Sequence, residues 1–543
     1  MAGRLIAATG PATDGHPVIV RGRVRTMDDA RPLAEAMLVR GGRVVATGEA
    51  AALRALEPSA RVEEARGTVL PGFIDAHVHT LVVGLERRRL TISDAGSVRE
   101  VVERVRDWLA RHPGLDWAVV GAHFHAEDLA EGRLPNRHDL DPVSGTTALY
   151  LDRRTHDAIV NTAALQRSGI DRTTPDPPGG TIERDDDGEP TGVLIERPAA
   201  DLVFSQVPPV DLDELHAALA EGQAHLHSLG VVGAAEPGLT PAELAVYQEA
   251  WTSGTLTLRT LAMPLVDTAV PPEEFLTGLG TVTGFGDERL RIGPLKVYFD
   301  GTGGFGTALL SREWPGKPGY HGTQVCSTET FQALADHCAT RGWSLAVHTV
   351  GDEAVRIVLE CMARADRLRP VRDLRFSVMH AYLWPSAESM ELAARLGVVL
   401  STQPSMHWRV GAGIADRFGA PAGDLAPLRA WADAGVRLAG GSDGPDFPMS
   451  PLFGMWQSRT RRVRGRDAPL GPHSALTPAE ALRMWTVDAA YYCFADDERG
   501  SLAPGKLADW VEVSVDPVEA DDDELASAMV LRTVVGGREV FAL

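Results

Sequence analysis

The sequence is poor in lysine. Of its 53 basic residues only three, Lys296, Lys317 and Lys506, are lysines. Arginine serves at nearly every position that needs only a positive charge, so the remaining lysines are candidates for positions where an arginine would fail. Lys296 lies in the apolar run 292–300, which predicts a buried strand. A charged amine there is costly unless it is paired or chemically changed; a salt-bridged or snorkelling lysine is the structural alternative.

Cysteine is also scarce. The four cysteines, Cys326, Cys338, Cys361 and Cys493, form no C-x-x-C pair and suggest no disulfide framework. The first residues show neither the apolar core nor the cleavage site of a signal peptide. No apolar run approaches the roughly 20 residues that cross a bilayer. We therefore expect a cytoplasmic protein in a reducing compartment.

Positive charge is in the minority as well. The formal net charge of −21 argues against nucleic acid, which needs basic surface to neutralise phosphates. We expect a small-molecule substrate, no membrane partner and a possible homodimer. A chain of 543 residues can bury a large core and hold one large domain with a smaller one.

The most informative motif in the sequence is Pro-Gly-Phe-Ile-Asp-Ala-His-Val-His at residues 71–79. It places His77 and His79 at positions i and i+2 at the end of an apolar run. On a strand these two side chains point to the same face and can converge on one metal ion, whereas on a helix they would diverge by about 200°. Two other such pairs occur. His225 and His227 lie in an Ala-rich helical pattern and are predicted to be surface residues, and His123 and His125 follow a strand-like run.

Strand-like runs alternate with helical stretches along the centre of the chain. The runs are 73–76, 231–235, 256–261, 295–299, 344–347, 374–379, 398–401 and 436–439. Repeating βα units imply a parallel sheet, and eight of them suggest a closed (β/α)8 barrel. The segments near both termini alternate apolar and polar residues around glycine-rich turns, as short antiparallel strands do.

This pattern predicts three parts of an α/β protein. Residues 1–68 and 497–543 are expected to build one small composite β-sandwich domain from both ends of the chain. Residues 69–496 are expected to form the barrel. Residues 88–215 interrupt the repeat after the first barrel strand and are interpreted as an insertion over the barrel mouth.

Polar residues recur at the ends of the predicted barrel strands. They are His77 and His79 after the first strand, Lys296 in the fourth, His348 after the fifth, His380 after the sixth and Asp443 after the eighth. One histidine at a strand end is commonly a hydrogen-bonded core residue, and one aspartate after Gly-Ser is commonly a turn or a helix cap. Their succession, however, forms an N/O ligand set suited to zinc or a similar divalent ion.

With these residues in view, the chain resembles the amidohydrolase superfamily. Within it, the chain is most similar to the YtcJ-like branch, amidohydrolase family 3, which includes N-substituted formamide deformylase. The matching segments are 71–79, 134–141, 156–165, 176–180, 188–193, 295–301, 441–443 and 500–509. They extend over nearly the whole chain.

The resemblance implies a distorted barrel that holds one or two divalent metal ions. His77 and His79 would hold one ion, and His348 and His380 the second. Lys296, carboxylated by CO2, would bridge them, and Asp443 would bind metal and act as the catalytic proton shuttle. The expected reaction is hydrolysis of an amide or formamide C–N bond by metal-activated hydroxide.

The substrate itself is left open. His156 and Arg154, on the insertion, and Tyr382, Trp384 and His407 are candidates for substrate binding, although such aromatic residues are more often plain core. The same metal site could hydrolyse an ester, a lactone or a carbamate, and a non-catalytic binding protein could keep the fold. The G-x-G-x-x-G sequence at 301–306 lacks the acidic ribose contact of a dinucleotide site, so we interpret it as a loop.

Overall fold

The computed structural model describes residues 16–122, 124–153, 157–419 and 423–543. Its contacts divide the chain into two units. The first joins Met1–Thr80 to Ala220–Leu543, and the second is Leu81–Leu219. The predicted insertion, 88–215, lies within the second unit.

Strands from both ends of the chain share one sheet in the first unit. Its order is β21 (Arg538–Ala542), β20 (Val530–Val535), β19 (Trp510–Val513), β4 (Arg61–Pro71), β1 (Val18–Arg25), β2 (Leu33–Arg40) and β3 (Arg43–Gly48). The pairings are antiparallel except that β1 and β4 run parallel. Helix α1 (Ala50–Leu56) packs Leu53 against Ile19 and Leu38 of this sheet. The two ends of the chain are thus joined by the antiparallel pairing of β4 with β19.

Two parallel sheets follow in the same unit. One has the order β13 (Leu290–Ile292), β12 (Arg259–Pro264), β11 (Val231–Leu239) and β5 (Phe73–Asp75). The other has the order β14 (Leu295–Tyr298), β15 (Leu345–Gly351), β16 (Ser377–Leu383), β17 (Val399–Thr402) and β18 (Leu438–Gly440). The strand predicted at 295–299 is confirmed as β14, but the longer apolar run 292–300 is not one strand, because Gly293-Pro294 separates β13 from β14. Proline has no N–H for a strand ladder, which ends β13 there.

Hydrogen bonds connect the two parallel sheets on both sides. The backbone N–H of Val266, just after β12, donates to the carbonyl of Lys296 in β14 at 2.8 Å. The N–H of Ala76, just after β5, donates to the carbonyl of Gly440 in β18 at 2.9 Å. One apolar cluster also takes side chains from both sheets, among them Ile74, Ala235, Leu261, Ala346, Met379, Val399 and Ala439.

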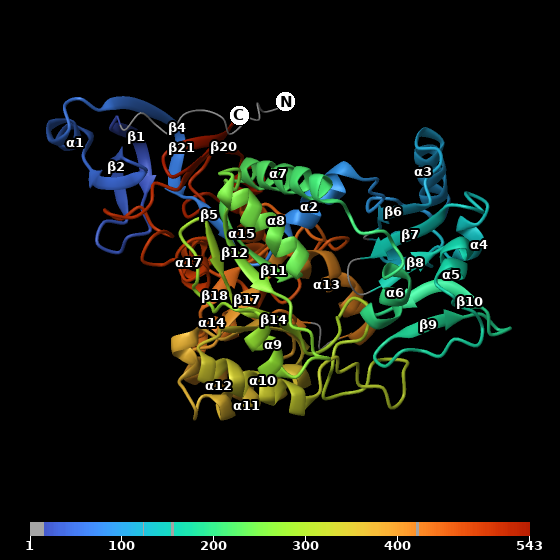
Figure 1. Cartoon of the computed structure of the whole chain (residues 1–543). Helices are drawn as coiled ribbons and strands as arrows, with labels where there is room; N and C mark the ends of the chain where they lie inside the picture. The colour runs from blue at the N-terminus through green and yellow to red at the C-terminus, as the bar shows by residue number, and fades with distance from the viewer. Residues whose placement is uncertain (1–15, 123, 154–156, 420–422) are drawn as a thin grey trace. The chain divides into compact units, whose positions relative to one another are not determined.

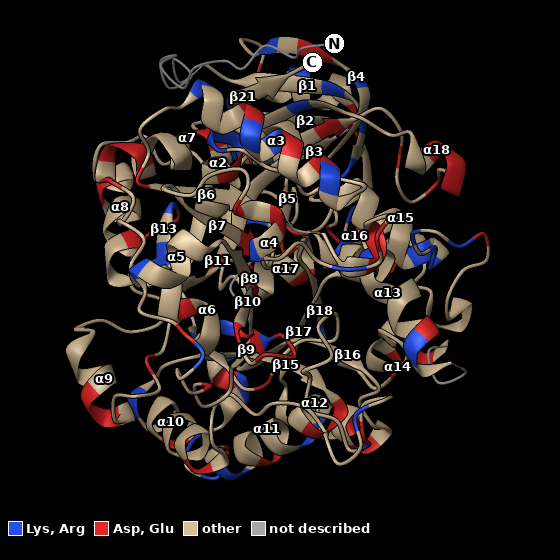
Figure 2. Ribbon diagram, turned by 90° about the vertical axis from the view of Figure 1, so that its right-hand side faces the viewer, with Lys and Arg blue, Asp and Glu red and all other residues tan. Residues whose placement is uncertain are grey.

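Helices lie between the parallel strands and after the last of them, and several begin with a side-chain cap. They are α8 (Pro241–Thr252), α9 (Pro272–Gly278), α10 (Thr328–Arg341), α11 (Asp352–Ala365), α12 (Ala387–Leu396), α13 (Pro404–Phe418), α14 (Leu428–Asp433), α15 (Pro451–Thr460), α16 (Pro478–Met484) and α17 (Val487–Tyr492), with α18 (Asp522–Ala526) near the C-terminus. Thr240 and Glu243 form a capping box at α8, and Gly342 ends α10 with φ +82°. In Figures 1 and 2, α9 to α12 lie outside the strands β14 to β18.

The second unit has a sheet of its own. Its order is β6 (Trp117–Gly121), β7 (Ala148–Arg153), β8 (Asp157–Val160), β10 (Pro190–Ile195) and β9 (Thr181–Arg184). Helices α3 (Val98–Arg111), α4 (Arg137–Leu140), α5 (Thr162–Arg167) and α6 (Arg197–Phe204) belong to this unit. Two apolar clusters form its core, one around Val101 and Val120, the other around Ala164 and Leu194. Asn161 caps α5 and also accepts from the N–H of Leu149, which ties that helix to β7. Helices α2 (Thr80–Arg88) and α7 (Leu212–Ser228) span the boundaries of the two units.

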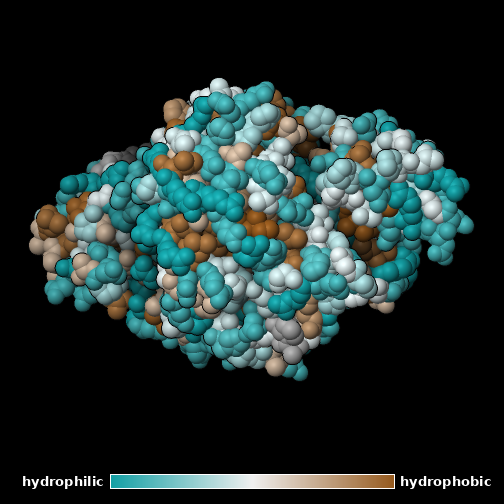
Figure 3. Space-filling view, turned by 90° about the horizontal axis from the view of Figure 1, so that it is seen from below, coloured by the Kyte–Doolittle hydropathy of each residue, from teal (hydrophilic) through white to brown (hydrophobic). Residues whose placement is uncertain are grey.

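The surface is predominantly polar. On the face shown in Figure 2, acidic and basic residues are intermixed along outer helices such as α11 and α12. Figure 3 shows separate apolar patches within a largely hydrophilic face. None of the helices in the described ranges combines the length and apolar composition that a bilayer crossing requires.

Candidate metal centre

Three potential metal ligands converge where β5 and β18 end. His77 and His79 follow β5, and Asp443 follows β18. Nε2 of His77 lies 3.3 Å and Nε2 of His79 lies 3.5 Å from Oδ1 of Asp443. One ligand atom from each residue lies within 4.8 Å of the others. His77 is buried, while His79 and Asp443 are partly accessible, so the group has one protected side and one open to solvent.

The backbone holds this group together. Asp443 donates its N–H to the carbonyl of His77 at 2.7 Å, and His79 donates to the carbonyl of Gly444 at 3.0 Å. Oδ1 of the fully buried Asp75 accepts from the N–H of His77 at 3.0 Å and from the N–H of Ser442 at 2.9 Å. One carboxylate therefore ties both ligand-bearing segments. Asp443 has φ +56°, a left-handed conformation that is uncommon for a residue with a side chain.

Electrostatics favour a neutral imidazole at His77 and an ionised carboxylate at Asp443. Burial lowers the pKa of His77 to about 4, against the opposing effect of Asp443. Burial alone would raise the pKa of Asp443, but the imidazoles of His77, His79 and His380 outweigh it and hold the pKa of Asp443 well below its usual value. Within the described residues, Nδ1 of His77 is buried without a hydrogen-bond partner. Neutral imidazole and carboxylate are the protonation states that ligate metals.

Two further predicted ligands lie beside this group. The ring of His380 is 5.1 Å from that of His77, and the ring of His348 is 4.6 Å from that of His380. Both histidines lie inside their strands rather than at the strand ends, because β15 continues to Gly351 and β16 to Leu383. Strand β16 is irregular at this point, with φ +72° at His380. Burial lowers the pKa of His380 well below its usual value, which keeps its ring neutral.

Lys296 is buried in β14, as the sequence indicated. Its Nζ lies 2.9 Å from Sδ of Met379 and 4.8 Å from the centre of the Tyr298 ring. Burial lowers the pKa of Lys296 to about 7, and Asp443 is the charged group that opposes the shift. An amine with this pKa is about half uncharged at neutral pH.

Glu236 is a buried neighbour of the centre that was not among the predicted site residues. It is buried in β11, and its Oε2 accepts from the N–H of Thr80 at 2.7 Å. Burial raises the pKa of Glu236, while His79 and the Thr80 hydrogen bond act against the rise. The hydroxyl of Tyr247 interacts with the same carboxylate. In the sequence, Glu236 directly follows the apolar run 231–235, which was predicted to be a strand. A polar residue at the end of a predicted barrel strand was the signal that could have identified it.

Three of the predicted substrate-binding residues lie in the described part of the structure, and each has a different environment. The hydroxyl of Tyr382, in β16, accepts from the N–H of Gly303 in the loop after β14 at 3.1 Å. Trp384 packs edge-on against Phe418 at 4.7 Å. His407 is buried in α13, 3.2 Å from the carbonyl of Leu470, within the packing of that helix. His156 and Arg154 lie outside the described residues.

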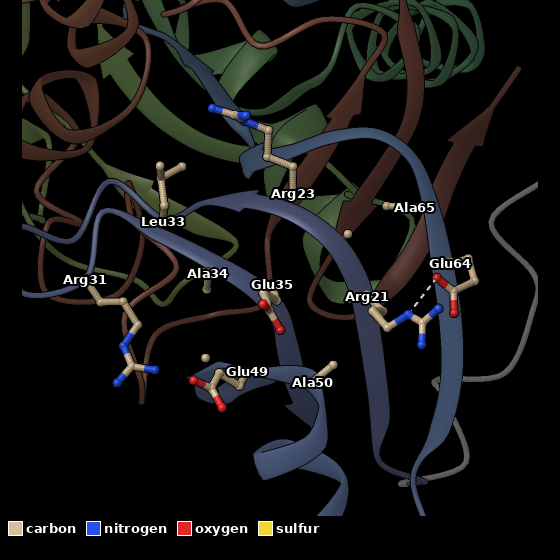
Figure 4. Close-up of a pocket in the computed structure, with 12 residues that line it drawn as sticks. Arg21, Arg23, Arg31, Leu33, Ala34, Glu35, Glu49, Ala50, Glu64 and Ala65 are labelled. Atoms are coloured by element: carbon tan, nitrogen blue, oxygen red, sulfur yellow. Dashed lines mark hydrogen bonds and ion pairs between the residues drawn. The ribbon is translucent and has the colours of Figure 1, made fainter.

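A cavity of about 880 Å³ lies elsewhere, against the seven-stranded sheet (Figure 4). It is lined by residues of β1, β2 and β4 and by the start of α1. Arg21 and Glu64 in its wall pair at 3.0 Å. None of the predicted ligands lines it, so this cavity is distinct from the candidate metal centre.

Known proteins resemble this chain over most of its length. The sequence profile of the amidohydrolase family matches residues 65–541. N-substituted formamide deformylase of Arthrobacter pascens is 31% identical over 550 residues, which cover 96% of this chain and 97% of the relative. A metal-dependent hydrolase from Pyrococcus horikoshii has a TM-score of 0.73 at 20% identity, with 93% of this chain and 99% of that chain covered. Atrazine chlorohydrolase of Arthrobacter aurescens, complexed with zinc, has a TM-score of 0.51 at 18% identity, with 96% and 94% covered.

Proposed function

The chain belongs to the amidohydrolase family and is a hydrolase, and we propose that it uses a divalent metal to cleave the C–N bond of a small N-acyl or N-formyl compound. The observation that carries this proposal is the convergence of His77, His79 and Asp443 within 4.8 Å. The 31% identical deformylase supports a formamide or related amide as the substrate.

The donor set fits a divalent ion. Two imidazole nitrogens and one carboxylate oxygen, with His380 and His348 beside them, are the N/O ligands that zinc prefers. The neutral state of His77 and the ionised state of Asp443 leave lone pairs free for binding. When bound, such an ion lowers the pKa of water towards neutrality and polarises a carbonyl group.

Asp443 is the proposed catalytic proton carrier. Its ionised carboxylate can accept the proton that water loses on attacking the carbonyl carbon, and can return that proton to the leaving nitrogen. The partial accessibility of Asp443 and His79 leaves this carboxylate on the open side of the centre. Tyr382, Trp384 and His407, with His156 and Arg154, remain the proposed substrate-binding residues.

Lys296 is proposed to carry a carbamate, which would add an oxygen ligand to the metal centre. The uncharged amine attacks CO2, an N–C bond forms, and the amine loses a proton to water. The pKa of about 7 supports this step, because a large fraction of the amine is uncharged at neutral pH. The carbamate oxygens would take the place of the present contact with Met379.

For the fold, we propose that the two parallel sheets close into a distorted (β/α)8 barrel. The hydrogen bonds from Val266 to Lys296 and from Ala76 to Gly440, on opposite sides of the sheets, support closure. We also propose that 1–68 and 497–543 form a composite β-sandwich domain and that 88–215 forms the insertion over the barrel mouth.

A direct test is hydrolysis of matched compounds. The purified protein is loaded with zinc, and release of formate and amine is followed with an N-alkyl formamide, the matching formate ester and the matching acetamide. We expect metal-dependent release from the formamide that stops on chelation and returns on adding metal. Cleavage of the ester alone, or amide cleavage that chelation leaves unchanged, would contradict the proposal.

A further inference from the structure

His380 is linked by hydrogen bonds to the segment after β5 that carries His77 and His79. Nδ1 of His380 lies 2.8 Å from Oε1 of Gln403, which follows β17. Nε2 of Gln403 donates to Oγ of Ser401 at 3.2 Å, and Oγ of Ser401 donates to the carbonyl of Ala76 at 3.3 Å. All three side chains are buried.

The chemistry of these groups sets the direction of each hydrogen bond. The carbonyl of Ala76 can only accept, so Ser401 must use its proton there. The oxygen of Ser401 is then free to accept from the amide N–H of Gln403. This orients the amide with Oε1 towards His380, and because an amide oxygen can only accept, the proton of the neutral imidazole must be on Nδ1.

We propose that Gln403 is a positioning residue that fixes His380 in the tautomer with its proton on Nδ1 and so leaves the lone pair of Nε2 for a metal ion. The proposal rests on the proposed function, since it gives His380 a place at the metal centre. The ring lies between those of His77 and His348, at 5.1 and 4.6 Å. A ligating histidine needs one nitrogen without a proton, and a hydrogen bond at the other nitrogen selects which one.

The local backbone makes Gln403 available for this task. Gln403 is the residue before α13, and Pro404 takes the first helical position with its fixed φ. The Gln403 side chain does not cap the helix, so it can extend to His380 instead. The helix start thus fixes the backbone of Gln403, and Ser401 fixes its amide.

Glutamine also suits the charge of the site. Asp75 and Asp443 already place two carboxyl groups near the histidines. A neutral acceptor fixes the tautomer without adding a third buried charge, whose desolvation would be costly.

The first test measures metal affinity rather than activity. The dissociation constants of Zn²⁺ and Co²⁺ are determined by competition with a chromophoric chelator for the wild type, Gln403→Met and Gln403→Glu. Methionine keeps the volume but removes the acceptor, whereas glutamate keeps an acceptor oxygen. We expect Gln403→Met to weaken binding by about 10- to 100-fold, the usual effect of losing such a partner, and Gln403→Glu to restore most of it.

Two controls separate positioning from general destabilisation. Gln457 is another buried glutamine, in α15, whose Nε2 donates to the carbonyl of Arg462, so Gln457→Met is expected to leave metal affinity unchanged. In a His380→Ala background, Gln403→Met should have no further effect. An undiminished effect there, or wild-type affinity in Gln403→Met, would overturn the proposal. If Gln403→Met does not fold, Ser401→Ala, which removes only the hydroxyl that orients the amide, replaces it.

The second test reads the tautomer directly in metal-free protein. Imidazole ¹⁵N resonances of His380, identified by their loss in His380→Gln, should show a protonated Nδ1 and a bare Nε2. Gln403→Met should give a mixture of tautomers. A protonated Nε2 in the wild type would refute the inference even if the protein binds metal, whereas a protein that binds no metal but shows the Nδ1 tautomer would refute the proposed function alone.

Discussion

Asp443 contacts His77 through both its backbone and its side chain. The N–H of Asp443 donates to the carbonyl of His77 at 2.7 Å, and its Oδ1 lies 3.3 Å from Nε2 of that histidine. The backbone hydrogen bond sets the distance between the segments after β5 and β18. The side-chain contact sets the distance between two potential metal-ligand atoms, Nε2 of His77 and Oδ1 of Asp443. The arrangement of these side chains is thus set by the fold, as a preorganised metal site would require.

Asp75 is expected to be essential for this spacing. Asp75→Ala removes the acceptor of two buried N–H groups, those of His77 and Ser442, at a cost of about 1–3 kcal/mol for each unsatisfied donor. We expect a lower melting temperature at fixed scan rate and weaker metal binding. Asp75→Asn keeps an acceptor oxygen and should lose much less of both. Equal behaviour of the two variants would contradict the role of Asp75 as a shared acceptor.

Lys296 should tolerate neither arginine nor alanine. A guanidinium cannot readily form a carbamate, and alanine has no amine, so in both variants kcat/KM for the formamide is expected to fall about 100-fold or more, the scale of losing one group that stabilises the transition state. Wild-type protein prepared in ¹³C-bicarbonate should show a carbamate carbon by NMR, and Lys296→Arg should not. A short carboxylic acid added to Lys296→Ala should restore part of the activity. Absence of the carbamate signal in fully active wild type would exclude the modification.

His227 should make stability depend on pH. It is buried, with Nδ1 2.9 Å from the carbonyl of Val231 and Nε2 3.0 Å from Oγ1 of Thr257. Burial lowers its pKa from 6.5 to about 4. A lowered folded-state pKa means that the stabilisation is complete above pH 6.5 and is lost as the pH falls towards 4, a change of roughly 3 kcal/mol.

The free energy of unfolding, or the melting temperature where unfolding is irreversible, should therefore fall less steeply between pH 6.5 and 4 in His227→Gln than in the wild type. His225→Gln is the matched control on the same helix, since His225 is only half-buried. A wild-type pH profile in His227→Gln would show that burial of this ring does not govern acid sensitivity.

His227 also illustrates what the sequence could not predict. The helix around it, α7, was predicted correctly, but the prediction of a surface side chain was wrong. The helical pattern gives the period of the buried face, whereas the partners of His227 come from Val231 after the helix and from Thr257, 30 residues away. Such contacts depend on tertiary packing, which a local pattern does not contain.

The candidate metal centre likewise has some features that the sequence could predict and others that it could not. The spacing of His77 and His79 and the position of Asp443 after a strand were readable, because strand geometry is local. The positive φ of Asp443 and His380, the shared carboxylate of Asp75 and the amide of Gln403 were not readable, since each depends on neighbours in other strands. The sheet of the second unit was missed for a related reason. Its strands are short and separated by turns rich in Pro, Gly and Asp, which on their own indicate loops.

The most direct test of the account is the metal content of the purified protein, measured by mass spectrometry for the wild type, His77→Ala, Asp443→Ala and the control Gln457→Met. We expect at least one divalent ion per chain in the wild type and the control, and loss of most of it together with formamide hydrolysis in the other two. A wild type that hydrolyses the formamide without bound metal, or ligand variants that keep the full metal content, would contradict the assignment of His77, His79 and Asp443 as the metal centre.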